Sequence, residues 1–151
     1  MKRSIIRKYL KNFLYILTIT VLISISTIII HEFGHFLLGL IANCKDVKII
    51  LFGFDFMKTY TILECMKNLD KKIIGLSGSF LVLPICIIMF LWIKTPDKYL
   101  SLVMLGFNLI ISTWDFEKYL GFINNELIIF LGIVLIIMGE ILTVEKYVFR
   151  R

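Results

Sequence analysis

The chain has 151 residues, of which 59% are hydrophobic and 14% aromatic, and its mean hydropathy is +0.91. A soluble domain is about 45–50% apolar, so this chain has too little polar surface for a soluble globule, and its aromatic content excludes a disordered chain. The 17 Lys and Arg residues outnumber the 11 Asp and Glu residues, but they flank apolar runs, which indicates anchoring at anionic lipid and excludes a nucleic-acid partner.

Four apolar runs predict the transmembrane helices of a single domain, 1–151. They cover about residues 13–42, 73–93, 99–120 and 122–142, and about 20 residues suffice to cross a hydrocarbon core. Lipid offers no partner to unpaired backbone groups, so each run must be helical. The first run is too long for the apolar region of a signal peptide and lacks a cleavage site, so we expect an uncleaved span. The predicted fold class is an all-α, multi-pass integral membrane protein of the cytoplasmic membrane.

A polar connection, residues 43–72, separates the first two runs. Within it, apolar and polar residues alternate from Val47 to Phe56, which predicts extended chain and a short β-hairpin at the membrane surface. The basic residues on the N-terminal side outnumber those on the other side, so the positive-inside rule predicts a cytoplasmic N-terminus. The three cysteines, Cys44, Cys65 and Cys86, are widely spaced, and their pattern indicates neither a disulfide framework nor a thiolate zinc site.

The only two histidines of the chain lie four residues apart, in His31-Glu32-Phe33-Gly34-His35. On a helix, positions i and i+4 share a face, so both imidazoles can reach one metal ion. Zinc binds imidazole nitrogen, and a catalytic zinc site keeps one position open for water. Glu32 can take a proton from that water. Because a carboxylate within an apolar run is costly unless paired, a neighbouring dication also explains Glu32.

A third metal ligand must come from elsewhere in the chain, and a carboxylate is the usual partner of two helical imidazoles. Asp115 is the best candidate because it is reached from within the third apolar run, and Glu117 is the second candidate. Asn108 and Ser112 share the helix face of Asp115, which indicates a polar cavity. The remaining carboxylates considered are Asp46, Asp55, Glu64, Asp70, Asp97 and Glu140.

These residues also have simpler interpretations. The two histidines and Glu32 can be interfacial groups at the end of a span, or a metal site without catalysis. Asp115 and Glu117 can be the solvated end of a helix. A non-catalytic accessory or immunity-type membrane protein therefore stays open, as does a zinc hydrolase acting on peptides at the membrane surface, which would favour Glu117 or Glu64 as ligand.

In three places the sequence resembles the site-2 protease family of intramembrane zinc metalloproteases. His31-Glu32-Phe33-Gly34-His35 lies in a long first helix, Ser77-Gly78 opens the next run, where the family often has Gly-Pro, and Asn108 precedes Asp115 in the third. The predicted hairpin falls where the family has a membrane-associated one. The chain departs from the family at Ile111, in place of a proline, and at Phe116, in place of a glycine.

The resemblance implies a three-helix metalloprotease core with one added helix, and cleavage of a peptide bond in a membrane-anchored protein or peptide. It implies Zn²⁺ held by His31, His35 and Asp115, with Glu32 as the catalytic base. Asn108 would steady the substrate or the oxyanion. The sequence leaves open whether a regulatory membrane partner or a second copy of the chain takes part.

Overall fold

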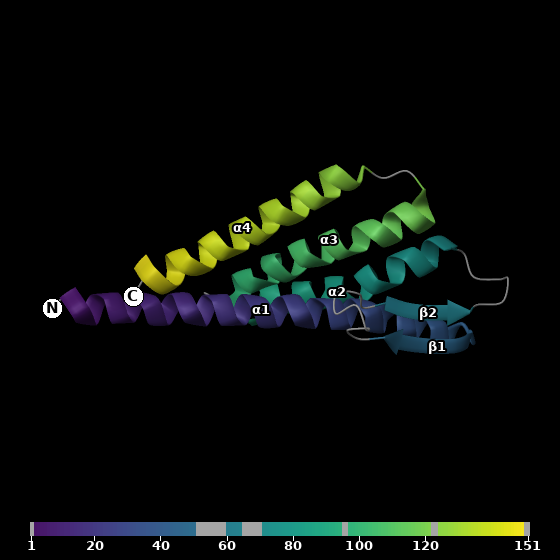
Figure 1. The fold of residues 1–151 in the computed structure, drawn as a ribbon, viewed down its shortest axis with the longest axis horizontal. Coiled ribbons are helices and arrows are strands. Elements are labelled where there is room, and N and C mark those ends of the chain that lie inside the picture. Colours follow the sequence, from purple (N-terminus) through teal and green to yellow (C-terminus); the bar gives the residue numbers. More distant parts are fainter. Residues whose placement is uncertain (1, 51–59, 65–70, 95–96, 122–123, 150–151) are drawn as a thin grey trace.

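The computed structural model describes residues 2–50, 60–64, 71–94, 97–121 and 124–149. In these ranges the chain is mainly helical, as predicted, with two strands between the first two helices (Figure 1). The elements in chain order are α1 (Lys2–Ile41), β1 (Lys45–Ile50), β2 (Tyr60–Glu64), α2 (Lys71–Trp92), the 3-10 helix η1 (Asp97–Tyr99), α3 (Leu100–Leu120) and α4 (Asn125–Phe149).

The first helix is longer than a membrane is thick. α1 contains 40 residues, which corresponds to about 60 Å at the helical rise per residue. No glycine or proline precedes Gly34, so the helix begins at Lys2 and runs through the basic segment before the predicted start at residue 13. Figure 1 shows the N-terminal part of α1 extending beyond the other helices.

Three helices are long and apolar enough to cross a membrane, and they mark the chain as a membrane protein. These candidate spans are Tyr9–Ile41, Asp97–Leu120 and Asn125–Tyr147. The fourth predicted span coincides with α2, whose apolar stretch, Leu76–Trp92, is shorter. In the described part of the chain, composition and length therefore support three of the four predicted spans directly.

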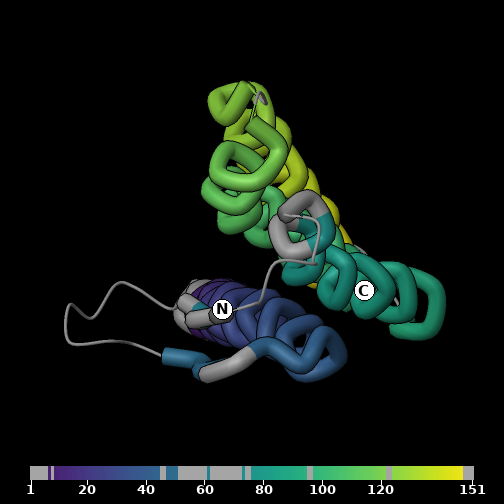
Figure 2. Tube along the Cα trace, turned by 90° about the vertical axis from the view of Figure 1, so that its right-hand side faces the viewer, coloured from purple at the N-terminus to yellow at the C-terminus, as the bar shows by residue number. Residues whose placement is uncertain are grey.

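Glycines allow α3 and α4 to pack closely as an antiparallel pair (Figures 1 and 2). A Cβ atom on Gly106 would lie 2.5 Å from the carbonyl oxygen of Gly132, and one on Gly132 would lie 2.7 Å from that of Gly106. A side chain at either position would force the backbones apart. Gly121 ends α3 in the left-handed conformation (φ 81°), and its N–H donates to the carbonyl oxygen of Phe116.

The interior of the bundle is more polar than its outside. The buried polar side chains are Thr27, His31, Glu32, His35, Ser77, Ser101, Asn108, Ser112, Thr113 and Thr143. Large apolar side chains such as Phe80, Leu91, Phe130 and Ile141 are exposed on the outer faces of α2 and α4. A lipid-facing surface with polar contacts inside is the arrangement expected of membrane helices.

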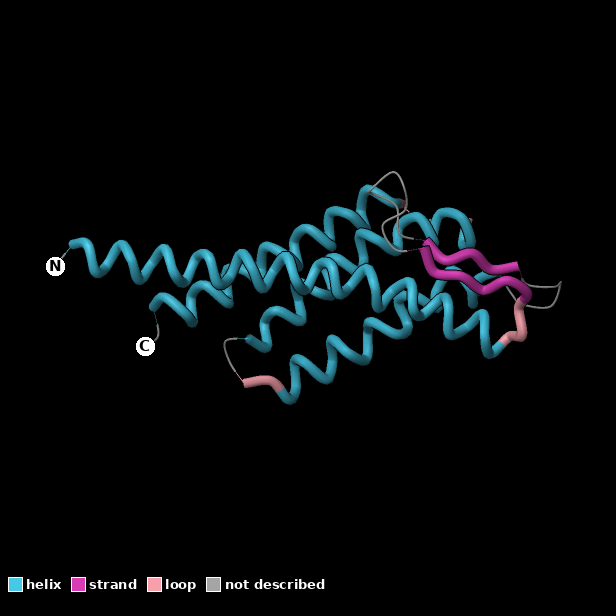
Figure 3. Tube along the Cα trace, turned by 60° about the horizontal axis from the view of Figure 1, so that its bottom comes forward, coloured by secondary structure: helices cyan, strands magenta, loops and turns pink. Residues whose placement is uncertain are grey.

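The two strands pair antiparallel at the end of the molecule opposite the N-terminus, beside the C-terminal part of α1 (Figure 3). The pairing runs from Lys45 opposite Glu64 to Ile50 opposite Tyr60, with one irregularity between Lys45 and Lys48. The rest of the predicted extended segment, which contains Asp55, lies outside the described residues. Cys44 is disulfide-bonded, contrary to the interpretation of the cysteine pattern, and Cys86 is a buried free thiol.

Candidate metal site

Two buried imidazoles lie on one face of α1. His31 is 1% and His35 is 6% exposed. Because they are one helical turn apart, their rings lie edge to face with centroids 5.0 Å apart, and their Nε2 atoms are 3.3 Å apart. The four-residue spacing in the sequence therefore brings the Nε2 atoms of the two histidines close to each other.

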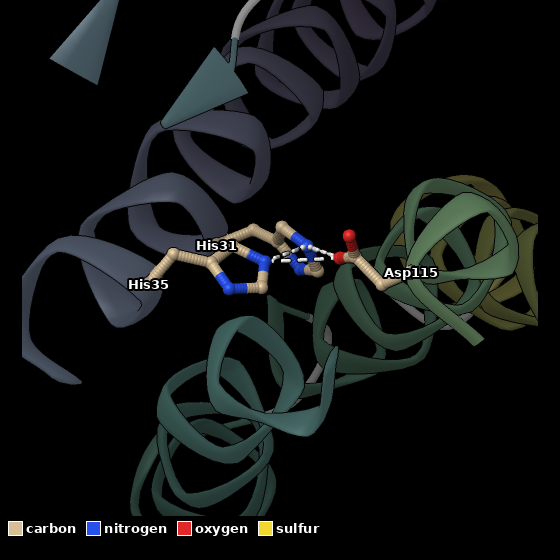
Figure 4. A group of neighbouring side chains, drawn as sticks. All are labelled: His31, His35 and Asp115. Atoms are coloured by element: carbon tan, nitrogen blue, oxygen red, sulfur yellow. Dashed lines mark hydrogen bonds and ion pairs between the residues drawn. The ribbon is translucent and has the colours of Figure 1, made fainter. Parts of the chain in front are cut away.

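Asp115 of α3 completes this group. Its Oδ2 atom lies 2.9 Å from Nε2 of His31 and 2.9 Å from Nε2 of His35. Figure 4 shows the carboxylate reaching from α3 toward both rings on α1. The Asp115 side chain is 22% exposed, whereas the His31 side chain is 1% exposed, so Asp115 is the most accessible member of the group.

The donor atoms of these three side chains fit a single divalent cation. All of them lie within 4.8 Å of one another, and the ligand atoms of a tetrahedral zinc site are about 3.3 Å apart. Three protein ligands leave one position for water or substrate, which is the pattern of a catalytic site. The same donor set suits other first-row divalent metals, so the geometry alone does not select zinc.

The other nitrogen of each ring contacts an oxygen from a different helix. Nδ1 of His31 lies 3.1 Å from Oδ1 of Asn108, and Nδ1 of His35 lies 2.8 Å from Oγ of Ser77. An amide oxygen only accepts, so Nδ1 of His31 carries a proton, and in the neutral ring Nε2 then presents a lone pair to Asp115. A cation, or a proton on one of the rings, would bridge the Nε2 atoms and the carboxylate oxygen of Asp115.

Close approach of α1 and α2 depends on Gly34 and Gly78. A Cβ atom on Gly78 would lie 2.5 Å from Nε2 of His31, and one on Gly34 would lie 2.5 Å from the carbonyl oxygen of Ser77. Because α2 begins at Lys71, the predicted Ser77-Gly78 pair lies inside the helix instead of opening it. Sequence reasoning singled out the Ser77-Gly78 pair, but it did not predict the contact between Ser77 and His35.

Glu32 is buried beside the group and contacts the strand β2. Oγ1 of Thr61 lies 2.8 Å from Oε2 of Glu32 and 3.0 Å from the carbonyl oxygen of the same residue. Glu32 is 7% exposed, so this hydroxyl is an important partner for its carboxylate. Sequence reasoning did not identify Thr61, because a contact between a strand and a helix so far apart in the chain leaves no local pattern.

The predicted polar face of α3 is tied to α2. Oγ of Ser112 lies 2.6 Å from Oγ of Ser79 and donates to the carbonyl oxygen of Asn108 over 2.7 Å. Asn108 and Ser112 are both buried. The face expected to line a cavity is therefore occupied by hydrogen bonds between helices.

Three of the other candidate ligands accept hydrogen bonds from partners other than the histidines. Glu117 is exposed and accepts from Nδ2 of Asn125 over 2.7 Å. Asp97 accepts from Tyr147, and Glu140 accepts from Thr20. Asp55 and Asp70 lie outside the described residues, as do the side chains of Asp46 and Glu64. Among the described residues, Asp115 is the carboxylate grouped with both histidines.

No family model, curated protein or solved structure matches this chain.

Proposed function

We propose that this protein is an intramembrane zinc metalloendopeptidase of the cytoplasmic membrane, similar to the site-2 proteases, with a multi-pass topology. The observation that carries the proposal is the convergence of His31, His35 and Asp115 from two helices on one point. This convergence comes together with the adjacent buried carboxylate of Glu32. The proposed substrate is a membrane-anchored protein or peptide.

The proposed chemistry needs water near a site built from membrane helices. The rise of α1 from Lys11 to His31 is about 30 Å, which is one hydrocarbon thickness. Glu117 and Lys118, just beyond Asp115 on α3, are exposed, and so is the neighbouring Trp114. If Lys11 lies at one membrane surface, the site lies near the other surface, within reach of water and of the end of a substrate helix.

In this proposal each side chain has a separate role. His31, His35 and Asp115 would hold the metal, which, when bound, polarises the scissile carbonyl and makes water acidic enough to attack at neutral pH. Glu32 takes a proton from the attacking water as the C–O bond forms, and it gives that proton to the amine nitrogen as the C–N bond breaks. Thr61 orients the Glu32 carboxylate for both transfers.

The strand pair offers a place for the substrate. A helical peptide bond is shielded by its own hydrogen bonds, so a substrate must unwind before hydrolysis. We propose that β1 and β2 form a membrane-associated hairpin, whose edge binds the unwound segment by adding a strand. The contact between Thr61 and Glu32 would place such a segment beside the catalytic carboxylate.

The test is metal content and cleavage by the purified protein in detergent. We expect about one zinc per chain in wild type and in Glu32→Gln, and cleavage of a membrane-anchored reporter by wild type but not by Glu32→Gln. Glu117→Gln is the matched control, because this carboxylate is exposed on α3 and contacts Asn125. Cleavage by Glu32→Gln at the wild-type rate would exclude the proposed role of Glu32.

A second candidate function rests on the direct 2.9 Å contacts between Asp115 and both rings. A protonated imidazole paired with Asp115 would clamp α1 to α3 without any metal, as in a non-catalytic accessory protein. This candidate predicts no bound zinc and loss of folding in His31→Ala. Metal analysis of the wild-type protein distinguishes the two.

A further inference from the structure

The Nδ1 atoms of the two imidazoles, which lie away from Asp115, contact side chains on two different helices. Asn108 of α3 contacts Nδ1 of His31, and Ser77 of α2 contacts Nδ1 of His35. Asn108 is 2% and Ser77 is 8% exposed, so both contacts are shielded from water. Each ring is thus bound at one nitrogen by a neighbouring helix, while the other nitrogen points to Asp115.

This arrangement determines the orientation of each ring and the position of its proton. The amide oxygen of Asn108 accepts from Nδ1 of His31, which leaves the lone pair on Nε2. The Ser77 hydroxyl can accept from Nδ1 of His35 in the same way. A metal ligand whose second nitrogen donates to a protein oxygen has its tautomer set before the metal arrives.

Asn108 is itself held in place. The backbone carbonyl oxygen of Asn108 accepts from Oγ of Ser112, and the same Oγ contacts Ser79 on α2. The backbone of α3 at Asn108 is therefore linked to the same helix that presents Ser77. Helices α2 and α3 together form a support against which both rings on α1 are fixed.

We propose that Asn108 and Ser77 are positioning residues that orient His31 and His35 for metal binding, and that Asn108 acts through His31 and not on the substrate oxyanion. The inference rests on the proposed function, because it assumes that the site takes a metal. It gives Asn108 a role different from the substrate-side role expected from the sequence. The two roles differ in what they do to metal affinity in the absence of any substrate.

The experiment measures Co²⁺ binding to the purified protein in detergent, by chelator competition and by the visible spectrum of the bound ion. We expect Asn108→Ala and Ser77→Ala each to weaken binding by about 10- to 100-fold and to change the spectrum. Asn108→Asp keeps an acceptor oxygen toward His31 and should retain affinity within a few-fold of wild type. Thr113→Val is the matched control, since this buried hydroxyl of α3 donates to the carbonyl oxygen of Ile110 over 2.7 Å and leaves both histidines untouched.

The outcomes separate this inference from the proposed function. If Asn108→Ala binds Co²⁺ with wild-type affinity and spectrum but cleaves slowly, Asn108 acts on the substrate and the inference is wrong. If wild type binds Co²⁺ but cleaves nothing, the proposed function fails while the affinities of the variants still decide the inference. If wild type binds no Co²⁺ or Zn²⁺, both are wrong. Rescue of the affinity by Asn108→Asp would show that the loss in Asn108→Ala is not a general folding defect.

Discussion

A hydroxyl from a strand holds the carboxylate that we propose as the general base. Thr61 donates to Glu32 Oε2, and the same oxygen of Thr61 also lies within hydrogen-bond distance of the Glu32 main chain. A buried carboxylate that loses its donor keeps its desolvation cost without compensation. The orientation of Glu32 therefore depends on β2, which is outside the helix that carries the two histidines.

Replacing the hydroxyl of Thr61 should slow catalysis without removing the metal. We expect Thr61→Val to cleave a membrane-anchored reporter about 10- to 100-fold more slowly, because a hydrogen bond to a charged group contributes about 1.5–3 kcal/mol. Thr61→Ser keeps the hydroxyl and should restore most of the rate. The measurements are the cleavage rate and the zinc content per chain. A Thr61→Val protein as fast as wild type would show that Glu32 is oriented without this contact.

The residues of the site differ in how far the sequence could predict them. His31, Glu32 and His35 could be identified because a spacing of four on one helix is local information. Asp115 could be proposed because few carboxylates lie within apolar runs, and the structure groups it with the histidines. Ser77 and Thr61 could not be paired with their partners, because their contacts depend on how separate elements pack in space.

At the scale of the helices, polar contacts link α4 to α1. Thr20 on α1 donates to Glu140 on α4, and Tyr147 on α4 donates to Asp97, while its hydroxyl oxygen lies 3.3 Å from that of Tyr15 on α1. A carboxylate within a membrane span is costly unless a polar partner is present. Helix α4 is thus held by hydrogen bonds at this end and by close glycine packing against α3.

Removing the hydroxyl of Thr20 should destabilise the bundle. We expect Thr20→Val to lower the free energy of unfolding by about 1–2 kcal/mol, because Glu140 loses a donor within the span. Thr18→Val is the matched control, since Thr18 is exposed on the same helix. The measurement is thermal unfolding in detergent. Equal stability of the two variants would mean that Glu140 is satisfied without Thr20.

Element boundaries and contacts were less predictable than element types. The apolar runs predict the helices but not their ends. α1 begins at Lys2 and α4 continues to Phe149, because basic and polar residues also extend a helix once it has formed. The close contact between Gly106 and Gly132 could not be predicted from either apolar run alone, because it depends on how α3 and α4 pack against each other.

The two ends of the molecule differ in their number of basic residues. Both chain termini lie at one end, while the strands lie at the other (Figure 1). Exposed Arg7, Lys11 and Lys94 belong to the end with the termini, and exposed Lys48 and Lys118 belong to the end with the strands, the site and Cys44. In the full sequence, the basic residues assigned to the first end outnumber those assigned to the second. Positive residues mark the cytoplasmic side, and disulfides persist in oxidising compartments.

These two cues agree on orientation, and labelling of cysteines in intact cells can test it. In a Cys86→Ala background, Cys44 and Cys65 are the remaining cysteines. We expect a membrane-impermeant maleimide to label Cys44, as located by mass spectrometry of the labelled peptide, only after an impermeant reductant opens its disulfide. The new thiol in Lys98→Cys, in η1 at the end with the termini, should be labelled only after the membrane is permeabilised. Labelling of Cys44 that also needs permeabilisation would place the strands in the cytoplasm and reverse the orientation. With the expected result, the proposed hydrolysis takes place near the outer surface of the membrane, so a substrate must present its cleavage site there.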